Sequence, residues 1–452
     1  MFKRLFIKYI VDTFIWRYIR WSKRFYYLKD FKKRQFNSIK ENGQLQKDKL
    51  YNMVVYAHKN VPYYQEIIKK HNISYKKETI FEDIKKFPIL TKKLIRENFE
   101  DLKSKGFKGK YRVNTSWWST GEPVTFLQDN IFLDYAWAST MLFNERCDKK
   151  EGEYMIKLRW SEREVLEWSQ WINWFLLRNF MNIEILNTFA FTEDDFKRYI
   201  NIINRKKPAI IEAYVQSIYE LAKYIRKEWL FIYSPKGITT SAWTLHDEVR
   251  KFIEEVFRCK VFNRYGSREV GDMASDCKEQ RGLHINIFMH HIEILDDAFH
   301  DVKVWESGNI YVTCLENYVM PLIRYQIGDI WQGSNKMLCS CGRWIPLIAS
   351  IKWREVNIFK TKDNRKIDGE FFTHLFYFKP WCKQFQVIQE DYNLIRIKIV
   401  TIWKSGTYEN DRQSIEMDIK KVMWMDCKVV FEALEYIPPT KSGKFLYTIS
   451  NI

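Results

Sequence analysis

The sequence lacks the features that would identify a membrane-spanning, fibrous or disordered protein. It has no internal repeat and no long low-complexity segment, which excludes a solenoid, a propeller or a generally disordered chain. No apolar run approaches the roughly 20 residues that a membrane-spanning helix needs. No small-residue cleavage site follows the N-terminal residues, so we expect no secretory signal peptide. A globular chain of 452 residues is too long for one ordinary core and predicts two lobes.

Basic residues outnumber acidic ones, and the formal net charge is +18. Such a charge attracts anionic partners, such as a nucleotide, a lipid surface or nucleic acid. The Lys and Arg residues are scattered among Asp and Glu and form no known nucleic-acid motif, so we expect no nucleic-acid partner. Eight cysteines without a secretion signal predict reduced thiols and a cytoplasmic protein, in which some thiols could hold a metal.

Residues 1–40 form a basic, aromatic N-terminal region. Trp16 and Trp21 stand beside Arg17 and Arg20, a composition suited to a helix on the inner face of an anionic membrane. The charges do not gather on one helical face, however, and a helix packed on the main domain explains the pattern equally well. Peripheral membrane contact and a packed helix are both open at this point.

The rest of the chain predicts an α/β fold with a second, smaller α+β domain. Between about 112 and 353, short β-rich segments alternate with helical segments, which is the pattern of a largely parallel sheet. Beyond this region the pattern changes to a small unit of strands and one long helix. We therefore expect a large domain with mixed and parallel sheets over 41–352 and a small, mobile lid domain over 353–452.

Helical periodicity dominates the segment of about 44–98, where apolar residues recur at three- and four-residue steps. Val61 and Pro62 are expected to end one helix and begin the next. Thr91 is expected to cap a helix that starts at Lys92, since its hydroxyl can accept from the first turn.

Two motifs have the residues of a phosphate and magnesium site. The string TSWWSTGEP, 115–123, has hydroxyl residues and a glycine that let backbone N–H groups approach phosphate, although such strings also make plain turns. The string FNRYGSREVG, 262–271, follows a strand to the carboxyl end of the predicted sheet, where ligands bind in open α/β folds. Glu269 in this string could hold Mg²⁺, and a solvent-exposed charged loop is the alternative.

Two further motifs suit the sugar and the reacting phosphate of a nucleotide. In MPLIRYQIGDI, 320–330, Asp329 could accept hydrogen bonds from ribose hydroxyls. In PPTKSGKF, 438–445, Lys444 follows a Ser-Gly turn and could stabilise charge that develops at an α-phosphate. A Gly-Asp turn and a surface lysine are the ordinary alternatives.

In this order, and together with ITTSA at 238–242 and CSCGR at 339–343, the motifs resemble those of the phenylacetate–CoA ligase-like, CapK-type branch of the adenylate-forming superfamily. That branch includes capsular polysaccharide biosynthesis proteins, and the resemblance runs from about residue 40 to the C-terminus. It implies an enzyme that uses ATP and Mg²⁺ to convert a small carboxylic acid into an acyl adenylate. The acyl group would then pass to CoA, an amine or a hydroxyl.

The resemblance also assigns residue roles. It implies that Lys444 and Glu269 are catalytic and that Glu269 binds Mg²⁺. The residues that it assigns to nucleotide binding are Ser119, Thr120, Gly121, Ser241, Tyr265, Gly266, Ser267, Asp329 and Arg354.

Two departures from the family pattern accompany these matches. Trp117 and Trp118 replace a glycine of the phosphate loop and lengthen it, and Trp353 precedes Arg354 where a glycine is expected. Backbone freedom is lost where phosphate should approach. The competing hypothesis is therefore a catalytically degenerate family member that acts as a membrane-associated binding or scaffold protein.

A metal site is a separate hypothesis. Cys277 and His284 form a C-x6-H pair, and Cys339 and Cys341 form a C-x-C pair. Thiolate and imidazole ligands form a tetrahedral Zn²⁺ set, which would be structural because four protein ligands leave no open position. Four unrelated residues are the alternative.

Overall fold

The computed structural model describes residues 22–115, 124–159, 181–188, 193–241, 244–303, 306–332, 339–348, 351–354, 358–363, 366–376, 379, 381–402, 406–438 and 446–452. The chain forms two compact units. The first comprises Met1–Trp117, Glu122–Ile327 and Trp331–Ile351, and the second comprises Trp118–Gly121, Gly328–Ile330 and Lys352–Ile452. None of the helices in the described ranges is both long enough and apolar enough to cross a membrane.

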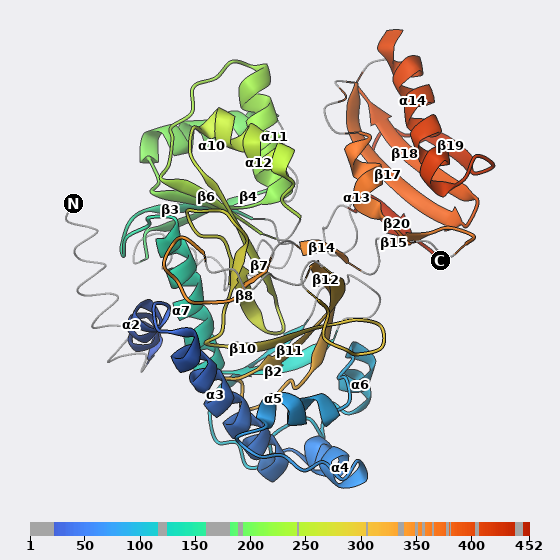
Figure 1. Ribbon diagram of the computed structural model, residues 1–452. Helices are drawn as coiled ribbons and strands as arrows, with labels where there is room; N and C mark the ends of the chain where they lie inside the picture. The colour runs from blue at the N-terminus through green and yellow to red at the C-terminus, as the bar shows by residue number, and fades with distance from the viewer. Residues whose placement is uncertain are drawn as a thin grey trace. The chain divides into compact units, whose positions relative to one another are not determined.

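An eight-stranded sheet lies at the centre of the first unit (Figure 1). Its strand order is β13-β9-β8-β7-β6-β5-β3-β4. Pairing is parallel from β4 through β7 and antiparallel from β7 through β13, so the expected α/β class with a largely parallel core is confirmed. The strands are β3 (Met155–Arg159), β4 (Ile183–Asn187), β5 (Ile210–Tyr214), β6 (Gly237–Ser241), β7 (Val261–Ser267), β8 (Gly271–Ser275), β9 (Leu283–Ile285) and β13 (Leu347–Ile348).

Three helices lie side by side against this sheet (Figure 1): α10 (Glu193–Lys206), α11 (Val215–Lys227) and α12 (Asp247–Phe257). Their apolar residues recur every three or four positions and are buried, as Val249, Ile253 and Phe257 are in α12. Helices α11 and α12 connect neighbouring parallel strands, so β5, β6 and β7 all end at one edge of the sheet. In an open α/β fold that carboxyl edge is the place for a ligand.

Another sheet has the order β10-β11-β12-β14, and its strands β10 and β11 belong to the first unit. Its strands are β10 (His290–Leu295), β11 (Ser307–Cys314), β12 (Tyr325–Gln332) and β14 (Ile351–Arg354). The N-terminal helices pack near it and share its apolar core: α3 (Ile39–Asn60), α4 (Pro62–Lys70), α5 (Ile80–Asp83) with the 3-10 turn η2 (Ile84–Lys86), and α6 (Lys92–Glu97). Both predicted helix boundaries are confirmed, because α4 begins at Pro62 and the Thr91 hydroxyl accepts from the Leu94 N–H.

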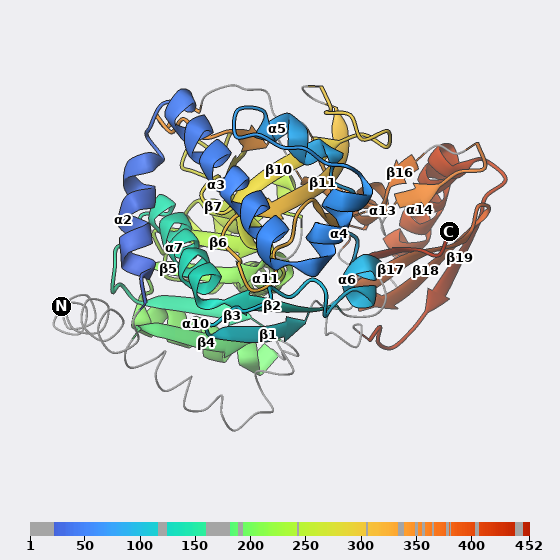
Figure 2. The same ribbon diagram turned by 90° about the horizontal axis from the view of Figure 1, so that it is seen from below.

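The helix α2 (Arg24–Arg34) packs along α7 (Asn130–Arg146), as Figures 1 and 2 both show. The Tyr27 and Tyr135 rings lie 3.9 Å apart, and Phe31 is buried. Of the two open alternatives for the N-terminal region, the packed helix is therefore confirmed for Arg24–Arg34. Residues 1–21, which carry Trp16 and Trp21, lie outside the described part of the chain.

The second unit is built on a four-stranded sheet of order β19-β18-β17-β20. A buried apolar cluster that includes Trp381 and Phe385 lies between this sheet and its helices. The strands are β17 (Cys382–Asp391), β18 (Leu394–Thr401), β19 (Lys428–Ala433) and β20 (Thr448–Ser450), and the other elements are β15 (Ile358–Lys360), β16 (Lys366–Asp368), α13 (Gly369–His374) and α14 (Gly406–Met423). Its strands and long helix fit the small α+β unit expected from the sequence.

A buried carboxylate joins three parts of the first unit. Asp129 ends β2 (Thr125–Asp129), which pairs with β1 (Tyr111–Thr115), and it caps α7 by accepting from the Phe132 N–H at 2.8 Å. Its other oxygen accepts from the backbone N–H groups of Tyr318 at 2.6 Å and Val319 at 3.1 Å. Burial raises the pKa of Asp129, although these N–H groups favour the charged form.

We expect Asp129→Ala to lower the free energy of unfolding by about 3 kcal/mol, because it leaves three buried N–H groups without their acceptor. Denaturant unfolding followed by tryptophan fluorescence measures this. The control is Asp30→Ala, which removes a partly exposed pair with Arg34 and should cost under about 1 kcal/mol. Equal losses in the two variants would contradict the role of Asp129.

Candidate active site

The candidate site is built on the turn between β7 and β8, at the carboxyl edge of the parallel strands. Tyr265, Gly266 and Ser267 end β7, and Glu269 lies in the tight turn that follows. Gly266 has no room for a side chain, because an added Cβ would lie 2.6 Å from the Gly271 carbonyl oxygen. The glycine therefore lets the two strands approach closely at the point where the turn begins.

Glu269 is buried and held from two sides. The Tyr325 hydroxyl on β12 donates to Oε1 of Glu269 at 3.2 Å. The Gln128 amide on β2 donates to the backbone carbonyls of Arg268 at 2.8 Å and Glu269 at 3.2 Å. A solvent-exposed loop, the alternative weighed from the sequence, does not describe Glu269, since its side chain is enclosed.

The same turn reaches the strands that flank the phosphate-loop motif. Arg268 donates to the carbonyl oxygen of Thr115 at 3.4 Å, at the end of β1. Thr115 pairs with Thr125 across the β1–β2 hairpin, so the motif connects two paired strand ends beside this turn. Its residues Ser119, Thr120 and Gly121, together with Trp117 and Trp118, lie outside the described part of the chain.

An aromatic pair lies behind the turn. The rings of Tyr265 and Trp331 meet edge to face with centroids 5.0 Å apart. The indole N–H of Trp331 is buried and has no hydrogen-bond partner among the described residues. An unsatisfied buried donor at this place is costly unless a ligand or water meets it.

The remaining assigned residues lie on different elements. Ser241 is partly exposed at the carboxyl end of β6, where it pairs with Tyr214 of β5. Asp329 is buried on β12. Arg354 ends β14, and its side chain is outside the described part. Lys444 also lies outside the described residues, in the range assigned to the second unit.

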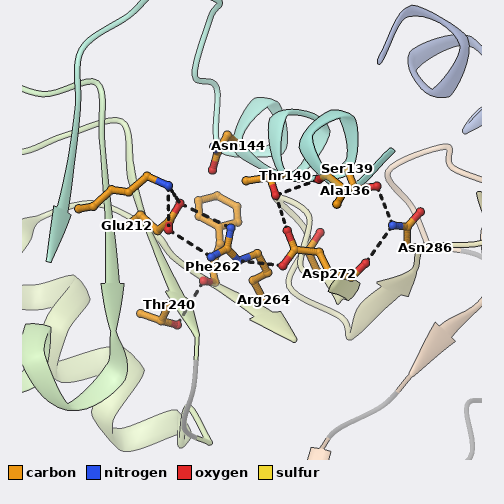
Figure 3. A network of polar contacts seen from close by, with 12 residues as sticks. Ala136, Ser139, Thr140, Asn144, Glu212, Thr240, Phe262, Arg264, Asp272 and Asn286 are labelled. Carbon is orange, nitrogen blue, oxygen red and sulfur yellow. Dashed lines mark hydrogen bonds and ion pairs between the residues drawn. The ribbon is translucent and has the colours of Figure 1, made fainter. Parts of the chain in front are cut away.

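A chain of buried and partly buried charges, which the sequence did not reveal, links β3, β5, β7 and β8 (Figure 3). Arg264 on β7 contacts Glu212 on β5 at 3.3 Å and Asp272 on β8 at 3.5 Å. Lys157 on β3 contacts Glu212 at 3.2 Å, and the Thr140 hydroxyl on α7 donates to Asp272 at 2.6 Å. Burial opposes the charge of Arg264, but Asp272 and Glu212 outweigh it and raise the pKa of the guanidinium.

The predicted cysteine and histidine cluster comes together at the antiparallel end of the large sheet. His284 on β9 pairs with Ser275 of β8 on one side and with Leu347 of β13 on the other. Cys277 follows β8, and the C-x-C pair precedes β13, so the sheet register gathers all four side chains. Their ligand atoms lie within 4.8 Å of one another.

The distances within this cluster suit a tetrahedral ion. The sulfurs of Cys277 and Cys339 are 3.5 Å apart, and the Cys341 sulfur is 3.4 Å from Nε2 of His284. Ligands of a tetrahedral Zn²⁺ are about 3.7 Å apart, given metal–sulfur bonds of about 2.3 Å. Burial opposes ionisation of Cys341, but hydrogen bonds from His284 and Arg343 lower its pKa to about 5. Burial raises the pKa of Cys339 to about 12 and lowers that of His284.

The chain is similar to known proteins along most of its length. The CapK C-terminal domain family matches residues 359–451. Protein CapK of Staphylococcus aureus is 25% identical over 439 residues, which cover 96% of this chain and 94% of that protein. The phenylacetate-coenzyme A ligase of Thermus thermophilus is 22% identical over 311 residues, which cover 66% and 67% of the two chains.

A solved structure of 2-hydroxyisobutyryl-CoA ligase, in the postadenylation state with its adenylate, shares the fold. The TM-score is 0.70 at 17% identity, and the match covers 91% of this chain and 88% of that one. The chain therefore shares the fold of an adenylate-forming ligase. The relatives and the matched C-terminal domain support the CapK-type, phenylacetate–CoA ligase-like branch that the motifs indicated.

The close approach at Gly266 gives a test of the turn. We expect Gly266→Ala to lower the free energy of unfolding by about 2 kcal/mol, because backbone atoms of Gly271 and Asp272 must move to admit the methyl group. Equilibrium unfolding in denaturant measures this change.

The matched control is Gly43→Ala. Gly43 lies inside α3 with open space around its Cβ position, so alanine should stabilise the helix by about 0.5–1 kcal/mol. If Gly266→Ala were as stable as the wild type or more stable, the β7–β8 turn would be shown to tolerate a side chain.

Proposed function

We propose that this protein activates a carboxylic acid with ATP and transfers the acyl group to CoA, an amine or a hydroxyl. In the first step a carboxylate oxygen attacks the α-phosphorus of ATP, and the bond to the β-phosphate oxygen breaks to release pyrophosphate. In the second step the acceptor attacks the acyl carbon and displaces AMP. The observation that carries the proposal is the enclosed Glu269, held at the carboxyl edge of the sheet beside the phosphate-loop strands.

The roles of this chain's residues follow from their chemistry. We propose that Glu269 holds Mg²⁺, which would screen the phosphate charges when bound. A buried carboxylate fits that ion, because hard oxygen ligands in an enclosed position are what Mg²⁺ requires. Asp329 would accept from ribose hydroxyls, and the Lys444 ammonium would stabilise the charge that develops at the α-phosphate.

The other assigned residues would shape the nucleotide pocket. Ser119, Thr120 and Gly121 would bring backbone N–H groups to the phosphates, and Tyr265 would pack against the adenine. The residues proposed to complete the pocket are Gly266, Ser267, Ser241 and Arg354. In this proposal the C-terminal domain, 353–452, delivers Lys444 for the first step and withdraws it for the second.

The resemblance to capsular polysaccharide proteins suggests the setting. We propose that the acyl group is used in the assembly of a cell-surface polysaccharide, with the acid as a small sugar acid, amino acid or related compound. The identity to protein CapK over nearly the whole of both chains supports this setting.

The test is pyrophosphate release from ATP and Mg²⁺ in the presence of pooled carboxylic acids. We expect acid-dependent release that falls about 10²–10³-fold in Lys444→Ala and in Glu269→Gln. The first variant removes the positive charge proposed to stabilise the α-phosphate, and the second removes the negative charge proposed to hold Mg²⁺. The control is Lys362→Ala, an exposed lysine of the second unit paired with Asp426, which should keep full activity.

If no acid in a broad pool gave pyrophosphate release, and calorimetry showed no ATP binding, the proposal would be contradicted. That result would favour the alternative of a degenerate scaffold protein, in which Trp117 and Trp118 close the phosphate loop. Activity that survives in both charge variants would instead contradict the assigned roles of Glu269 and Lys444.

We further propose that Cys277, His284, Cys339 and Cys341 hold a structural Zn²⁺. The donor set and its spacing support a tetrahedral ion that would tie β8, β9 and β13 together. With four protein ligands it would leave no position for a substrate.

Elemental analysis of the purified protein tests the zinc proposal. We expect about one zinc per chain in the wild type and far less in Cys341→Ser, with a melting temperature at least about 5 °C lower. The control is Cys259→Ser, a cysteine outside the cluster, which should keep its zinc. Metal-free wild-type protein of unchanged stability would contradict the site.

A further inference from the structure

Three adjacent apolar side chains, Trp229, Leu230 and Phe231, project from the first unit in the connection between α11 and β6. Trp229 is 93% exposed, Phe231 is 69% exposed and Leu230 is 38% exposed. We call these three residues the aromatic tip. Large apolar residues in a contiguous exposed group usually mark a binding surface.

The backbone of the tip is held firmly although its side chains are exposed. The Asn204 side chain at the end of α10 donates to the Phe231 carbonyl at 2.9 Å and accepts from the Tyr233 N–H at 2.6 Å. Arg258 at the end of α12 donates to the Ile232 carbonyl at 3.1 Å, and Ile232 is buried. These contacts from Asn204 and Arg258 therefore fix the backbone of the tip, while its three side chains stay exposed to solvent.

Trp229 occupies a position that favours glycine. It directly follows the end of α11 with a φ of 52°, and the Leu230 N–H closes the helix by bonding to the Ile225 carbonyl at 3.0 Å. Glycine is the usual residue at this left-handed helix end, because any Cβ adds strain there. Because the Trp229 side chain is almost fully exposed, it makes no packing contacts that would offset this backbone strain.

Basic residues lie beside the tip, and we call Arg205, Lys206, Lys207 and Arg258 the basic collar. Arg205, Lys206 and Lys207 follow Asn204 at the end of α10, are exposed, and make no ion pair within the described ranges. The Arg258 guanidinium lies 5.6 Å from the Phe231 ring. An apolar centre with a cationic rim matches the interface of an anionic bilayer, where aromatic rings lie among headgroups and Lys and Arg meet lipid phosphates.

The tip lies at the opposite edge of the sheet from the candidate active site. The segments 207–209, 228–236 and 258–260 precede β5, β6 and β7, so they lie at the amino ends of these strands. Glu269 and Ser241 lie at or beyond the carboxyl ends, about 17 Å away for a five-residue strand. A surface bound at the tip would leave the candidate active site open.

We propose that the aromatic tip and its collar dock the protein on an anionic lipid surface. The tip inserts Trp229, Leu230 and Phe231 at the headgroup level, and the collar contacts lipid phosphates. The net charge of +18 attracts the whole molecule to such a surface. A protein partner fits less well, because each aromatic offers only about 200 Å² and a stable interface buries about 800 Å² on each side.

Vesicle flotation of the full-length protein tests this proposal, with vesicles of phosphatidylcholine alone and with added phosphatidylglycerol. We expect the wild type to float only with the anionic vesicles and Trp229→Gly/Phe231→Ser to bind at least about tenfold more weakly. Lys206→Glu/Lys207→Glu should weaken binding by a similar factor, and this loss should shrink at high salt.

The matched control is Phe299→Ser. Phe299 is also exposed, at 53%, and has a φ of 62°, but its neighbours Asp296, Asp297 and Asp301 are acidic. This variant should bind vesicles like the wild type. Glycine relieves the strain at 229, so the tip variant should keep or raise its melting temperature, whereas a structural tryptophan would show a loss.

Two outcomes would overturn the proposal. Undiminished flotation of the tip variant would assign lipid binding to another part of the chain. A wild type that is dimeric without vesicles, by light scattering, and becomes monomeric in the tip variant would assign the tip to a second copy of the chain. The aromatic tip and the candidate active site lie at opposite edges of the large sheet. Pyrophosphate release in solution should therefore be the same in the wild type and the tip variant.

Discussion

The buried ion chain that joins Lys157, Glu212, Arg264 and Asp272 is the interaction on which the candidate site depends. It crosses one face of the sheet from β3 to β8 and reaches α7 through Thr140. Glu212 and Arg264 are buried and Lys157 and Asp272 are partly buried, so loss of one member leaves a charge in the interior without its partner. The β7–β8 turn that carries Glu269 begins four residues beyond Arg264, at Arg268, and the ion chain therefore sets where that turn stands relative to the parallel strands.

The register of the parallel strands brings residues that are far apart in the sequence to one candidate site. Because β5, β6 and β7 run in one direction, Tyr214, Ser241 and Ser267 end at one edge although they are far apart in sequence. The antiparallel continuation through β8, β9 and β13 gathers the four metal-binding candidates in the same way. One sheet thus positions two candidate sites of different chemistry, at its carboxyl edge and at its antiparallel end.

Local patterns in the sequence were enough to predict the elements and the fold class. The helix boundary at Pro62 and the cap at Thr91 follow from local backbone chemistry, and alternating segments indicated the α/β sheet. Contacts between distant strands could not be predicted this way, because neither Glu212 nor Arg264 has a local signature. The outward Trp229 was missed for a related reason: an aromatic residue in a sequence usually indicates core, and only the fold shows that this one is exposed.

The central claim is that the carboxylate attacks the α-phosphorus of ATP. A pool of carboxylic acids labelled with oxygen-18 in the carboxylate tests it directly, through the mass of the nucleotide product. The account predicts that one labelled oxygen appears in AMP, because the bond from that oxygen to the phosphorus survives acyl transfer. Label in inorganic phosphate together with ADP would show attack at the γ-phosphorus and contradict the account.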